Sequence, residues 1–215
     1  MARQYDRHAS ERRLIDAVDR LIARDGIAGV GVNAIARESG VNKSLLYRYF
    51  GSLAGLYSAY IEEMDVWPGV EEILGEDIER FRGASDAQIL SDVIPRYAQA
   101  LRRRPRTLEL LAAELVTRNE LTIEFERIRE GRSDEVFQRL GEIGIGNSAA
   151  LTATVALLVG AVNYLVVRAR SIRVFAGAQI QEDHFWGPQL AATIAQWLPP
   201  DPEEPGRPGS DTPRR

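Results

Sequence analysis

Hydrophobic positions repeat along this chain with the period of an α-helix almost everywhere. In the first such stretch the apolar residues recur at spacings of i, i+3, i+4, i+7 and i+8, which places them on one helix face; they are Leu14, Ala17, Val18, Leu21 and Ile22. Ser10 is positioned to cap the start of this helix, and Asp25-Gly26 to end it. No run of alternating apolar and polar residues predicts a strand. The pattern therefore predicts an all-α fold.

Three further helices are expected before about residue 65. The second helix is short, and its apolar positions and closing glycine are Val32, Ile35, Ala36 and Gly40. The third runs from about Lys43 to Phe50, with Asn42 as its N-cap, and Ser52 is placed to cap the fourth. One face of the fourth helix is apolar and consists of Leu53, Leu56, Tyr57, Tyr60, Ile61 and Met64. The segment WPGVEE, from Trp67, then predicts a break.

The rest of the chain predicts five longer helices and a polar tail. The expected helices span about Ala87–Arg103, Arg106–Asn119, Leu121–Gly141, Asn147–Val174 and Glu182–Trp197. The last residues, PPDPEEPGRPGSDTPRR from Pro199, are almost free of apolar side chains. Burial therefore cannot offset the entropy of ordering them, and we expect this tail to be disordered.

Composition restricts the chemistry that the chain can perform. Its 215 residues are 45% hydrophobic, which is enough for a substantial core. The absence of cysteine excludes disulfides and thiolate metal sites, and the two histidines, His8 and His184, lie far apart in the sequence. The N-terminus is polar and charged, without the apolar core of a secretory signal. We therefore expect a cytoplasmic protein without a bound metal.

The net charge of −4 is unevenly distributed. Residues 1–60 contain nine Lys and Arg against six Asp and Glu, so this segment is positive while the remainder is negative. An acidic total does not exclude a polyanionic partner, because the local field decides what each end of a protein attracts. The contrast permits nucleic-acid binding by the N-terminal segment without proving it.

The second and third helices together, GVNAIARESGVNKSLLYRYF, have the pattern of a helix-turn-helix. Gly40 suits the tight turn because it can adopt positive φ without a Cβ clash. In the third helix Leu46 and Phe50 share the buried face, and Ser44 and Arg48 lie opposite them. Recognition helices present such an outward face to the major groove. A solvated amphipathic helix without DNA binding is the alternative explanation of the same pattern.

The segment GVNAIARESGVNKSLLYRYFGSLAGLYSAY resembles the N-terminal signature of TetR-family transcriptional regulators. The resemblance covers about residues 10–60 and includes the Ile-Ala pair, the Gly-Val turn, the Leu-Tyr pair and the aromatic-Phe ending. It implies an all-α homodimer whose C-terminal helices form a ligand pocket and the dimer interface. The expected parts are a helix-turn-helix DNA-binding domain over 1–51, a helical effector-binding and dimerisation domain over 52–198, and the disordered tail over 199–215.

The resemblance also implies, by position, which side chains contact DNA. The family's base and phosphate contacts fall on Asn33, Lys43, Ser44 and Tyr47. Leu45 lies where a small hydroxyl residue often contacts the backbone, and it can instead meet a thymine methyl. Tyr49 lies where a His or Tyr contacts phosphate.

Two positions depart from the family pattern. Gly31 replaces the usual Ser or Thr that caps the second helix and touches phosphate, and Leu53 replaces a common lysine at the start of the fourth. Each departure is expected to remove one phosphate contact. Arg37 and Arg48 are the cations that can compensate.

An uncharged stretch of 24 residues, from Gly144 to Val167, is long enough to span a bilayer. The basic residues that would flank such a span are Arg168, Arg170 and Arg173. A buried core helix, or a helix shared between the core and a subunit interface, explains the same apolarity. We favour the shared helix in a two-fold dimer, because small residues let helices approach closely. The expected dimer surface consists of Ala149, Ala153, Ala156, Gly160, Ala191, Ala192 and Ile194.

A Gly-x-Gly-x-x-Ala match, GIGNSA from Gly144, is not expected to bind a dinucleotide. That fingerprint requires a preceding strand and an acid about 20 residues further on. The preceding VFQRLGEI predicts a helix, and the later RARSIR contains no acid. No nucleophile elbow, carboxylate pair or histidine-centred constellation is present. We therefore expect neither an enzyme nor a cofactor.

Candidate ligand contacts are polar or aromatic residues in apolar helical surroundings. They are Trp67, Tyr97, Glu114, Asn119, Phe125, Asn163 and Tyr164. Each also fits an ordinary role in the core or at an interface. Ligand pockets are mostly apolar with few polar groups, which favours a hydrophobic or amphipathic small molecule.

These observations predict a ligand-responsive transcriptional repressor. Two copies of the third helix would enter successive major grooves, about 34 Å apart, on a palindromic double-stranded DNA operator, and a small hydrophobic effector would release them. Two alternatives remain: a membrane-associated helical protein anchored by residues 144–167, and a helical interaction module without DNA binding.

Overall fold

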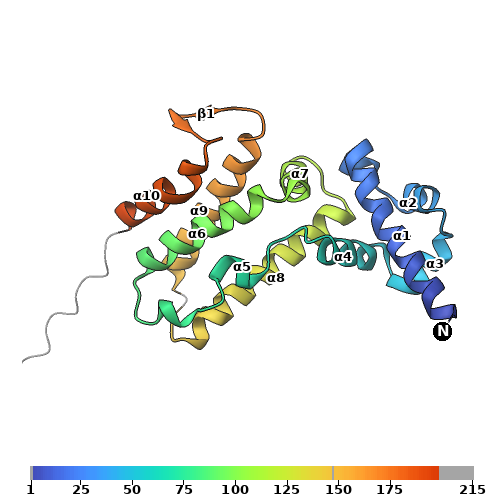
Figure 1. The fold of residues 1–215 in the computed structure, drawn as a ribbon, viewed down its shortest axis with the longest axis horizontal. Coiled ribbons are helices and arrows are strands. Elements are labelled where there is room, and N and C mark those ends of the chain that lie inside the picture. Colours follow the sequence, from blue (N-terminus) through green and yellow to red (C-terminus); the bar gives the residue numbers. More distant parts are fainter. Residues whose placement is uncertain (1, 147, 199–215) are drawn as a thin grey trace, which may run out of the picture.

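The computed structural model describes residues 2–146 and 148–198, whose regular structure is helical apart from one short hairpin (Figure 1). In chain order the helices are α1 (Ala2–Asp25), α2 (Val32–Ser39), α3 (Lys43–Phe50), α4 (Leu53–Glu63), α5 (Val70–Leu74), α6 (Asp86–Arg102), α7 (Pro105–Glu114), α8 (Glu120–Glu142), α9 (Ala149–Arg168) and α10 (Leu190–Trp197). Three short helical turns and the hairpin complete it: η1 (Ile27–Gly29), η2 (Glu79–Phe81), η3 (Phe185–Gln189), β1 (Val174–Phe175) and β2 (Ala178–Gln179). The predicted all-α class is confirmed.

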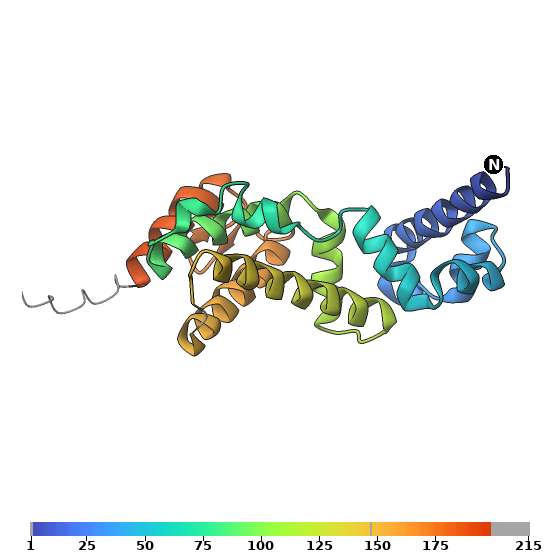
Figure 2. The ribbon, with the colours of Figure 1, turned by 90° about the horizontal axis from the view of Figure 1, so that it is seen from below.

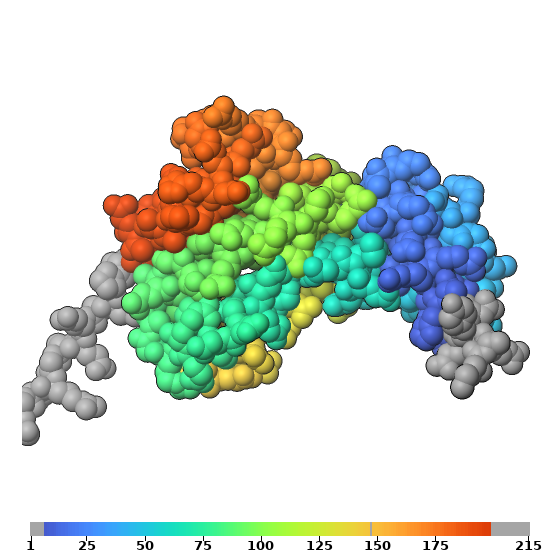
Figure 3. Space-filling view, in the orientation of Figure 1, coloured from blue at the N-terminus to red at the C-terminus, as the bar shows by residue number. Residues whose placement is uncertain are grey.

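The molecule is elongated, with a small helical head at one end and a larger helical body at the other (Figures 1 and 2). The head consists of α1, α2 and α3, and the body of α5 to α10. The two are joined by α4, which packs on both α1 and α8. In the space-filling view α7 also reaches the head, where it packs on η1 (Figure 3). The head therefore meets the body through two helices.

The helix-turn-helix in the head is built as its sequence predicts. Fully buried side chains in the head include Leu14, Val18, Ile35 and Leu46. Gly40 follows α2 with a φ of 66°, in the left-handed region that favours glycine. Asn42 Oδ1 then accepts a hydrogen bond at 2.9 Å from the backbone N–H of Ser44, one of the free donors of the first turn of α3. The predicted turn and N-cap are confirmed.

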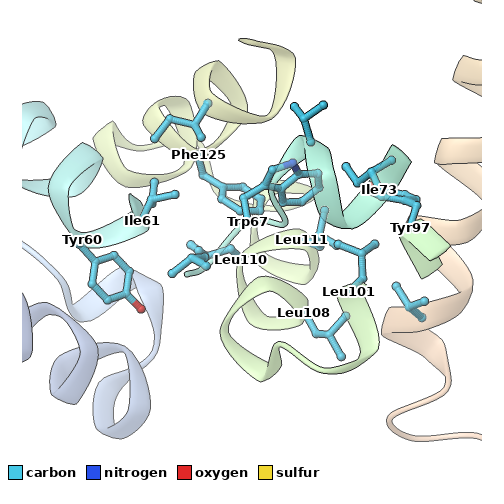
Figure 4. Packing of buried hydrophobic residues seen from close by; sticks show 14 of the residues in the cluster. Tyr60, Ile61, Trp67, Ile73, Tyr97, Leu101, Leu108, Leu110, Leu111 and Phe125 are labelled. Atoms are coloured by element: carbon cyan, nitrogen blue, oxygen red, sulfur yellow. The ribbon is translucent and has the colours of Figure 1, made fainter. Parts of the chain in front are cut away.

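An aromatic cluster lies in the body core (Figure 4). The ring centroid of Trp67 lies 6.0 Å from that of Tyr97 and 5.3 Å from that of Phe125, in tilted and edge-to-face geometries. These residues come from the connection between α4 and α5, from α6 and from α8. The cluster therefore ties together segments that are far apart in the sequence.

Several helix boundaries differ from the expected ones. α1 begins at Ala2 rather than near Ser10, which is a buried residue inside the helix. α7 ends at Glu114 rather than Asn119, because Asn119 caps α8: its Oδ1 accepts a hydrogen bond at 3.0 Å from the backbone N–H of Thr122. The short α5 follows the expected break at Trp67, and hydrophobic periodicity does not predict so short a helix.

The segment after α9 also departs from the sequence prediction. α9 ends at Arg168 rather than Val174, and Val174 pairs with Gln179 in an antiparallel hairpin. Ala176 and Gly177 connect the strands with positive φ at both positions, which suits a type I′ turn. Strands of two residues are too short for alternation to be visible in the sequence. The expected disordered tail, residues 199–215, lies outside the described residues.

Two glycine substitutions should have opposite effects on stability. Gly40→Ala places a Cβ in the left-handed region and should lower the free energy of unfolding by about 1–2 kcal/mol. Gly131→Ala lies inside α8 with open space around the new Cβ, and should raise it by about 0.5–1 kcal/mol. Urea unfolding followed by circular dichroism measures both values. Destabilisation by both variants would contradict the assigned turn and helix conformations.

Candidate nucleic-acid interface and ligand cavity

The outward side of α3, together with the adjacent part of α2, carries most of the candidate DNA contacts. Leu46 is fully buried and fixes which side of α3 faces the core. Six candidates are exposed: Asn33, Arg37, Lys43, Ser44, Tyr47 and Arg48. Leu45 and Tyr49 are partly buried and pack against the core. The structure therefore brings the eight candidates together on two neighbouring helices.

Among the side chains that the structure describes, no Asp or Glu lies within ion-pair distance of Lys43 or Arg48, the two cations of α3. Arg37 of α2 also forms no ion pair there, but its charge helps to lower the pKa of Asp25. By contrast, Arg20 and Arg24 of α1 both bind Glu38, at 2.9 and 2.8 Å. Hydrogen bonds from these two arginines hold the pKa of Glu38 below its ordinary value. The charge on the outward side of α3 is thus uncompensated, and such a patch attracts polyanions.

Tyr49 is held between two arginines, one of which the sequence does not reveal as a neighbour. Arg48 Nη2 donates a hydrogen bond to the Tyr49 hydroxyl at 3.1 Å, and its guanidinium carbon lies 5.0 Å from the ring centroid. The guanidinium carbon of Arg7, from α1, lies 5.4 Å from the same centroid. Arg7 reaches the Tyr49 ring because α1 begins about two turns before Ser10, the expected start.

At the two positions that depart from the family pattern, Gly31 and Leu53, no side chain can donate a hydrogen bond to phosphate. Gly31 is the N-cap of α2 and offers no side-chain hydrogen bond. Leu53, the first residue of α4, is partly buried and packs against the core. Neither side chain can bind phosphate, so the neighbouring cations are the groups available for that contact.

The body contains a cavity of about 610 Å³ between α6, α7, α8 and α9. Five of the seven candidate ligand contacts line it: Trp67, Tyr97, Glu114, Asn163 and Tyr164. Asn119 and Phe125 do not. Asn119 is the capping residue of α8, and Phe125 is fully buried against Trp67. The sequence pattern cannot separate these roles, because all seven are polar or aromatic residues among apolar neighbours.

Two polar contacts cross the cavity wall from helix to helix. The Tyr97 hydroxyl of α6 donates a hydrogen bond at 2.6 Å to Asn163 Oδ1 of α9, and burial raises the pKa of this tyrosine. Arg129 of α8 forms an ion pair with Glu114 of α7. Arg129 also lines the cavity, although sequence periodicity gives no signal for it. In the described part of the chain no group of three His, Asp or Glu is placed to hold a metal ion.

α9 presents an apolar face that its own protomer leaves uncovered. It is long and apolar enough to cross a membrane, yet only 17% of its most apolar window is buried. Ala153, Ala156 and Gly160, three of the expected dimer residues, are exposed, and Leu157 is 76% exposed. Ala149, at the start of α9, is exposed as well, and the other three expected residues, Ala191, Ala192 and Ile194, lie on α10.

The α10 residues of the expected dimer surface need correction. Ile194 is only 1% exposed, because α10 packs against α6 of the same protomer. It therefore cannot form a subunit contact. Ala191 is partly buried, and Ala192 is exposed.

A charged contact joins the body to the head. Arg106, at the start of α7, donates from Nε and Nη2 to the two carboxylate oxygens of Asp19 on α1, at 2.6 and 3.2 Å. The Tyr60 hydroxyl of α4 donates to the same carboxylate at 3.2 Å. The opposite end of α7 carries Glu114 of the cavity wall. One ten-residue helix thus runs from the cavity to the head.

Comparison with known proteins agrees with the N-terminal geometry. Residues 14–60 match the model of a family described as bacterial regulatory proteins, tetR family. An uncharacterized HTH-type transcriptional regulator of Mycobacterium tuberculosis is 41% identical over 49 residues, which are 23% of this chain and 24% of that protein. An HTH-type transcriptional repressor of Streptomyces coelicolor is 36% identical over 58 residues, 27% of this chain and 30% of that protein. The chain thus spans less than a third of the length of these curated relatives. The resemblance of its N-terminal segment to TetR-family regulators is confirmed.

Solved structures extend the similarity of fold to most of the chain. NalD, the secondary repressor of the MexAB-OprM multidrug efflux pump in Pseudomonas aeruginosa, has a TM-score of 0.57 at 19% identity, covering 89% of this chain and 96% of that chain. FadR from Bacillus subtilis, a transcriptional regulator solved in complex with stearoyl-CoA, has a TM-score of 0.51 at 19% identity, covering 87% and 98%. At this identity the likeness establishes a shared fold.

The Arg106–Asp19 contact should give stability a defined pH dependence. Hydrogen bonds from Arg106, supported by Tyr60, hold the pKa of Asp19 below its ordinary value of 3.8. The contact therefore stabilises the fold fully above about pH 4 and loses its effect as pH falls through the lowered pKa. Asp19→Asn should reduce the free energy of unfolding by about 1–2 kcal/mol at pH 7. This deficit should shrink in acid.

Urea titrations between pH 2.5 and 7 measure the difference between the wild type and Asp19→Asn. Asp16→Asn, one turn earlier on α1 and without an ion pair among the described side chains, is the matched control and should change stability little. A deficit for Asp19→Asn that stays constant down to pH 2.5 would contradict the proposed role of the charge.

Proposed function

We propose that this chain is a DNA-binding transcriptional regulator that acts as a repressor, and that a small ligand in the body cavity releases it from its operator. The observation that carries the proposal is the outward side of α3. Its cations, Lys43 and Arg48, have no carboxylate partner among the described side chains, and α3 is the second helix of a helix-turn-helix. Unpaired cations on the exposed side of this helix attract a polyanion such as DNA.

The expected contacts follow from the position of each side chain. Ser44, in the first turn of α3, offers a hydroxyl to base edges, because the N-terminal residues of a recognition helix enter the major groove. Lys43 and Tyr47 supply donors to phosphates, which set the register of the protein on the duplex. Arg48 stays beside Tyr49 and adds charge at the end of the helix. Arg37 extends this basic surface onto α2.

A second copy of the chain is the expected partner of α9. Two-fold symmetry would place the exposed face around Ala153 and Leu157 against its own equivalent, and would pair two heads for a palindromic site. A membrane span is the alternative for this helix. It is disfavoured because Val162 and Val166, on the other side of α9, are buried against the body. A single membrane-spanning helix would instead be surrounded by lipid on all sides.

The cavity supports a ligand-dependent switch. It is mostly apolar, and α7 connects it to the head through the Arg106–Asp19 contact. A ligand that displaces α7 would alter the position of α1 relative to the body, and through α4 the spacing of the two heads. A coupling free energy of about 1–3 kcal/mol would change operator affinity by roughly 5- to 150-fold.

Salt dependence tests the DNA-binding surface without knowledge of the operator. Lys43→Ala and Arg48→Ala should each lower the slope of log affinity against log salt by about 0.9 on any duplex, since each removes one phosphate neutralisation. Arg24→Ala is the matched control, because Arg24 is an exposed head arginine that is bound to carboxylates. Fluorescence anisotropy with a labelled fragment of the upstream region gives the slopes. Equal slopes for all four proteins would contradict the assigned surface.

The dimer surface has its own test. Leu157→Glu places a charge in the exposed apolar face of α9 and should convert a dimer into a monomer at micromolar concentration, with at least tenfold weaker operator binding. Val116→Glu is the control, because Val116 is 86% exposed in the connection between α7 and α8. Sedimentation equilibrium measures the mass of each protein. A monomeric wild type, or a dimeric Leu157→Glu, would contradict this interface.

A further inference from the structure

A cluster of cationic and aromatic side chains joins α3 to the first helix of the head. It consists of Arg7 of α1 with Arg48 and Tyr49 of α3, and we name it the Tyr49 cluster. The guanidinium carbons of Arg7 and Arg48 lie 5.4 and 5.0 Å from the centroid of the Tyr49 ring. Arg7 comes before residue 14, where the match to the family begins, so the resemblance implies no role for it.

The Tyr49 cluster lies at the C-terminal end of α3. The first turns of α1 lie beside α3 at the end of the molecule away from α10 (Figure 1). The N-terminal residues of a recognition helix contact base edges, so its last turn lies nearer the rim of the groove. The major groove is about 12 Å wide, and the eight residues of α3 are about 12 Å long. A helix of this length brings its last turn to the phosphates that border the groove.

Several hydrogen-bond donors of the Tyr49 cluster have no acceptor among the described residues. Arg48 Nη2 donates to the Tyr49 hydroxyl oxygen at 3.1 Å, so this hydroxyl directs its single proton elsewhere. No described residue accepts that proton. Both Nη atoms of Arg7, and Nε and Nη1 of Arg48, are likewise without a described acceptor. A phosphate group carries charged oxygens that can accept from all of these donors.

The Tyr49 cluster also has an excess of positive charge. Arg48 forms no ion pair with a described carboxylate. Arg7 Nε donates to Glu11 Oε1 at 2.7 Å, and His8 Nδ1 lies 3.4 Å from Glu11 Oε2. Among the described side chains, two guanidinium groups therefore face one carboxylate, and the excess favours an anionic partner.

Glu11 fixes the direction of Arg7. It lies one turn further along α1, and its side chain is only 18% exposed. Its carboxylate holds Nε of Arg7 while the Tyr49 ring packs beside the guanidinium, so the two Nη atoms stay available to an outside acceptor. An arginine held in this way loses less side-chain entropy when it binds phosphate.

We propose that the Tyr49 cluster binds the phosphodiester backbone of the operator, and that Arg7 is the cation by which α1 takes part in DNA binding. This inference rests on the proposed function and adds a binding surface to it. The Nη atoms of Arg7 and Arg48 donate to phosphate oxygens, and the Tyr49 hydroxyl donates the proton that it does not use within the protein. Such contacts set the position of the head on the duplex and read no base sequence.

The salt dependence of duplex binding tests Arg7. Fluorescence anisotropy of the full chain with the labelled upstream fragment should give a slope of log affinity against log salt that is lower by about 0.9 for Arg7→Ala and unchanged for Arg7→Lys. Arg12→Ala is the matched control, because Arg12 is another exposed α1 arginine that pairs with one glutamate, Glu63, at 3.2 Å. Its slope should equal that of the wild type. Arg7→Ala should weaken binding to a scrambled duplex by the same factor, since phosphates carry no sequence.

Tyr49→Phe tests the hydroxyl separately. The variant retains the ring and every charge, so the salt slope should stay unchanged while the affinity for both duplexes falls about three- to tenfold. Circular dichroism checks that each variant folds, and the Arg7 variants, at an exposed position, keep the inference testable even if Tyr49→Phe does not fold.

Three results would overturn the inference: a wild-type slope for Arg7→Ala, an equal loss of slope for Arg7→Ala and Arg12→Ala, or a loss of affinity for Arg7→Ala that is confined to the upstream fragment. Lys43→Ala is measured alongside. A lowered slope for Lys43→Ala with a wild-type slope for Arg7→Ala would refute only the role of the Tyr49 cluster. A wild type that binds neither duplex would instead refute the proposed function.

Discussion

Burial of Leu46 is the constraint on which the account of this molecule depends. A helix of eight residues is too short to be stable alone, so α3 depends on packing against the core of the head, where Leu46 is fully buried and Leu45, Tyr49 and Phe50 pack beside it. The left-handed Gly40 and the Asn42 cap fix where the helix begins. These three features together direct Lys43, Ser44, Tyr47 and Arg48 away from the core. The cationic surface follows from packing on the opposite side of the same helix.

The head meets the body through α4 and α7. A ligand that moves either helix can therefore change the position of the head. α4 is shared by both, and α7 carries a cavity residue at one end and Arg106 at the other. The Arg106–Asp19 pair is part-buried and bidentate, so a small rotation of α7 would weaken both hydrogen bonds together. A ligand therefore needs to act on one short helix to reach the DNA-binding surface.

The sequence predicts best those features that depend only on neighbouring residues. Periodicity, caps and the Gly40 turn belong to neighbouring residues, and the head follows them closely. The body is harder to predict from the sequence, because its features depend on contacts between segments that are far apart in the chain. In the sequence Asn119 cannot be told from Asn163, nor Phe125 from Tyr97. In the structure, however, Asn119 caps α8 and Phe125 packs on Trp67. Ile194 belongs to an apolar helix, but α6 covers it. Arg129 and Arg106 gain their roles only from carboxylates on other helices.

Hydroxyl-radical footprinting with and without saturating duplex tests the central claim most directly, because it reads side-chain exposure at the surface itself. Tyr47 is 47% exposed in the free protein, and Met64, at the far end of α4, is 38% exposed and serves as an internal reference. If α3 lies in the major groove, duplex should protect Tyr47 from labelling and leave Met64 unchanged. Undiminished labelling of Tyr47 when the protein is saturated with duplex would contradict the account.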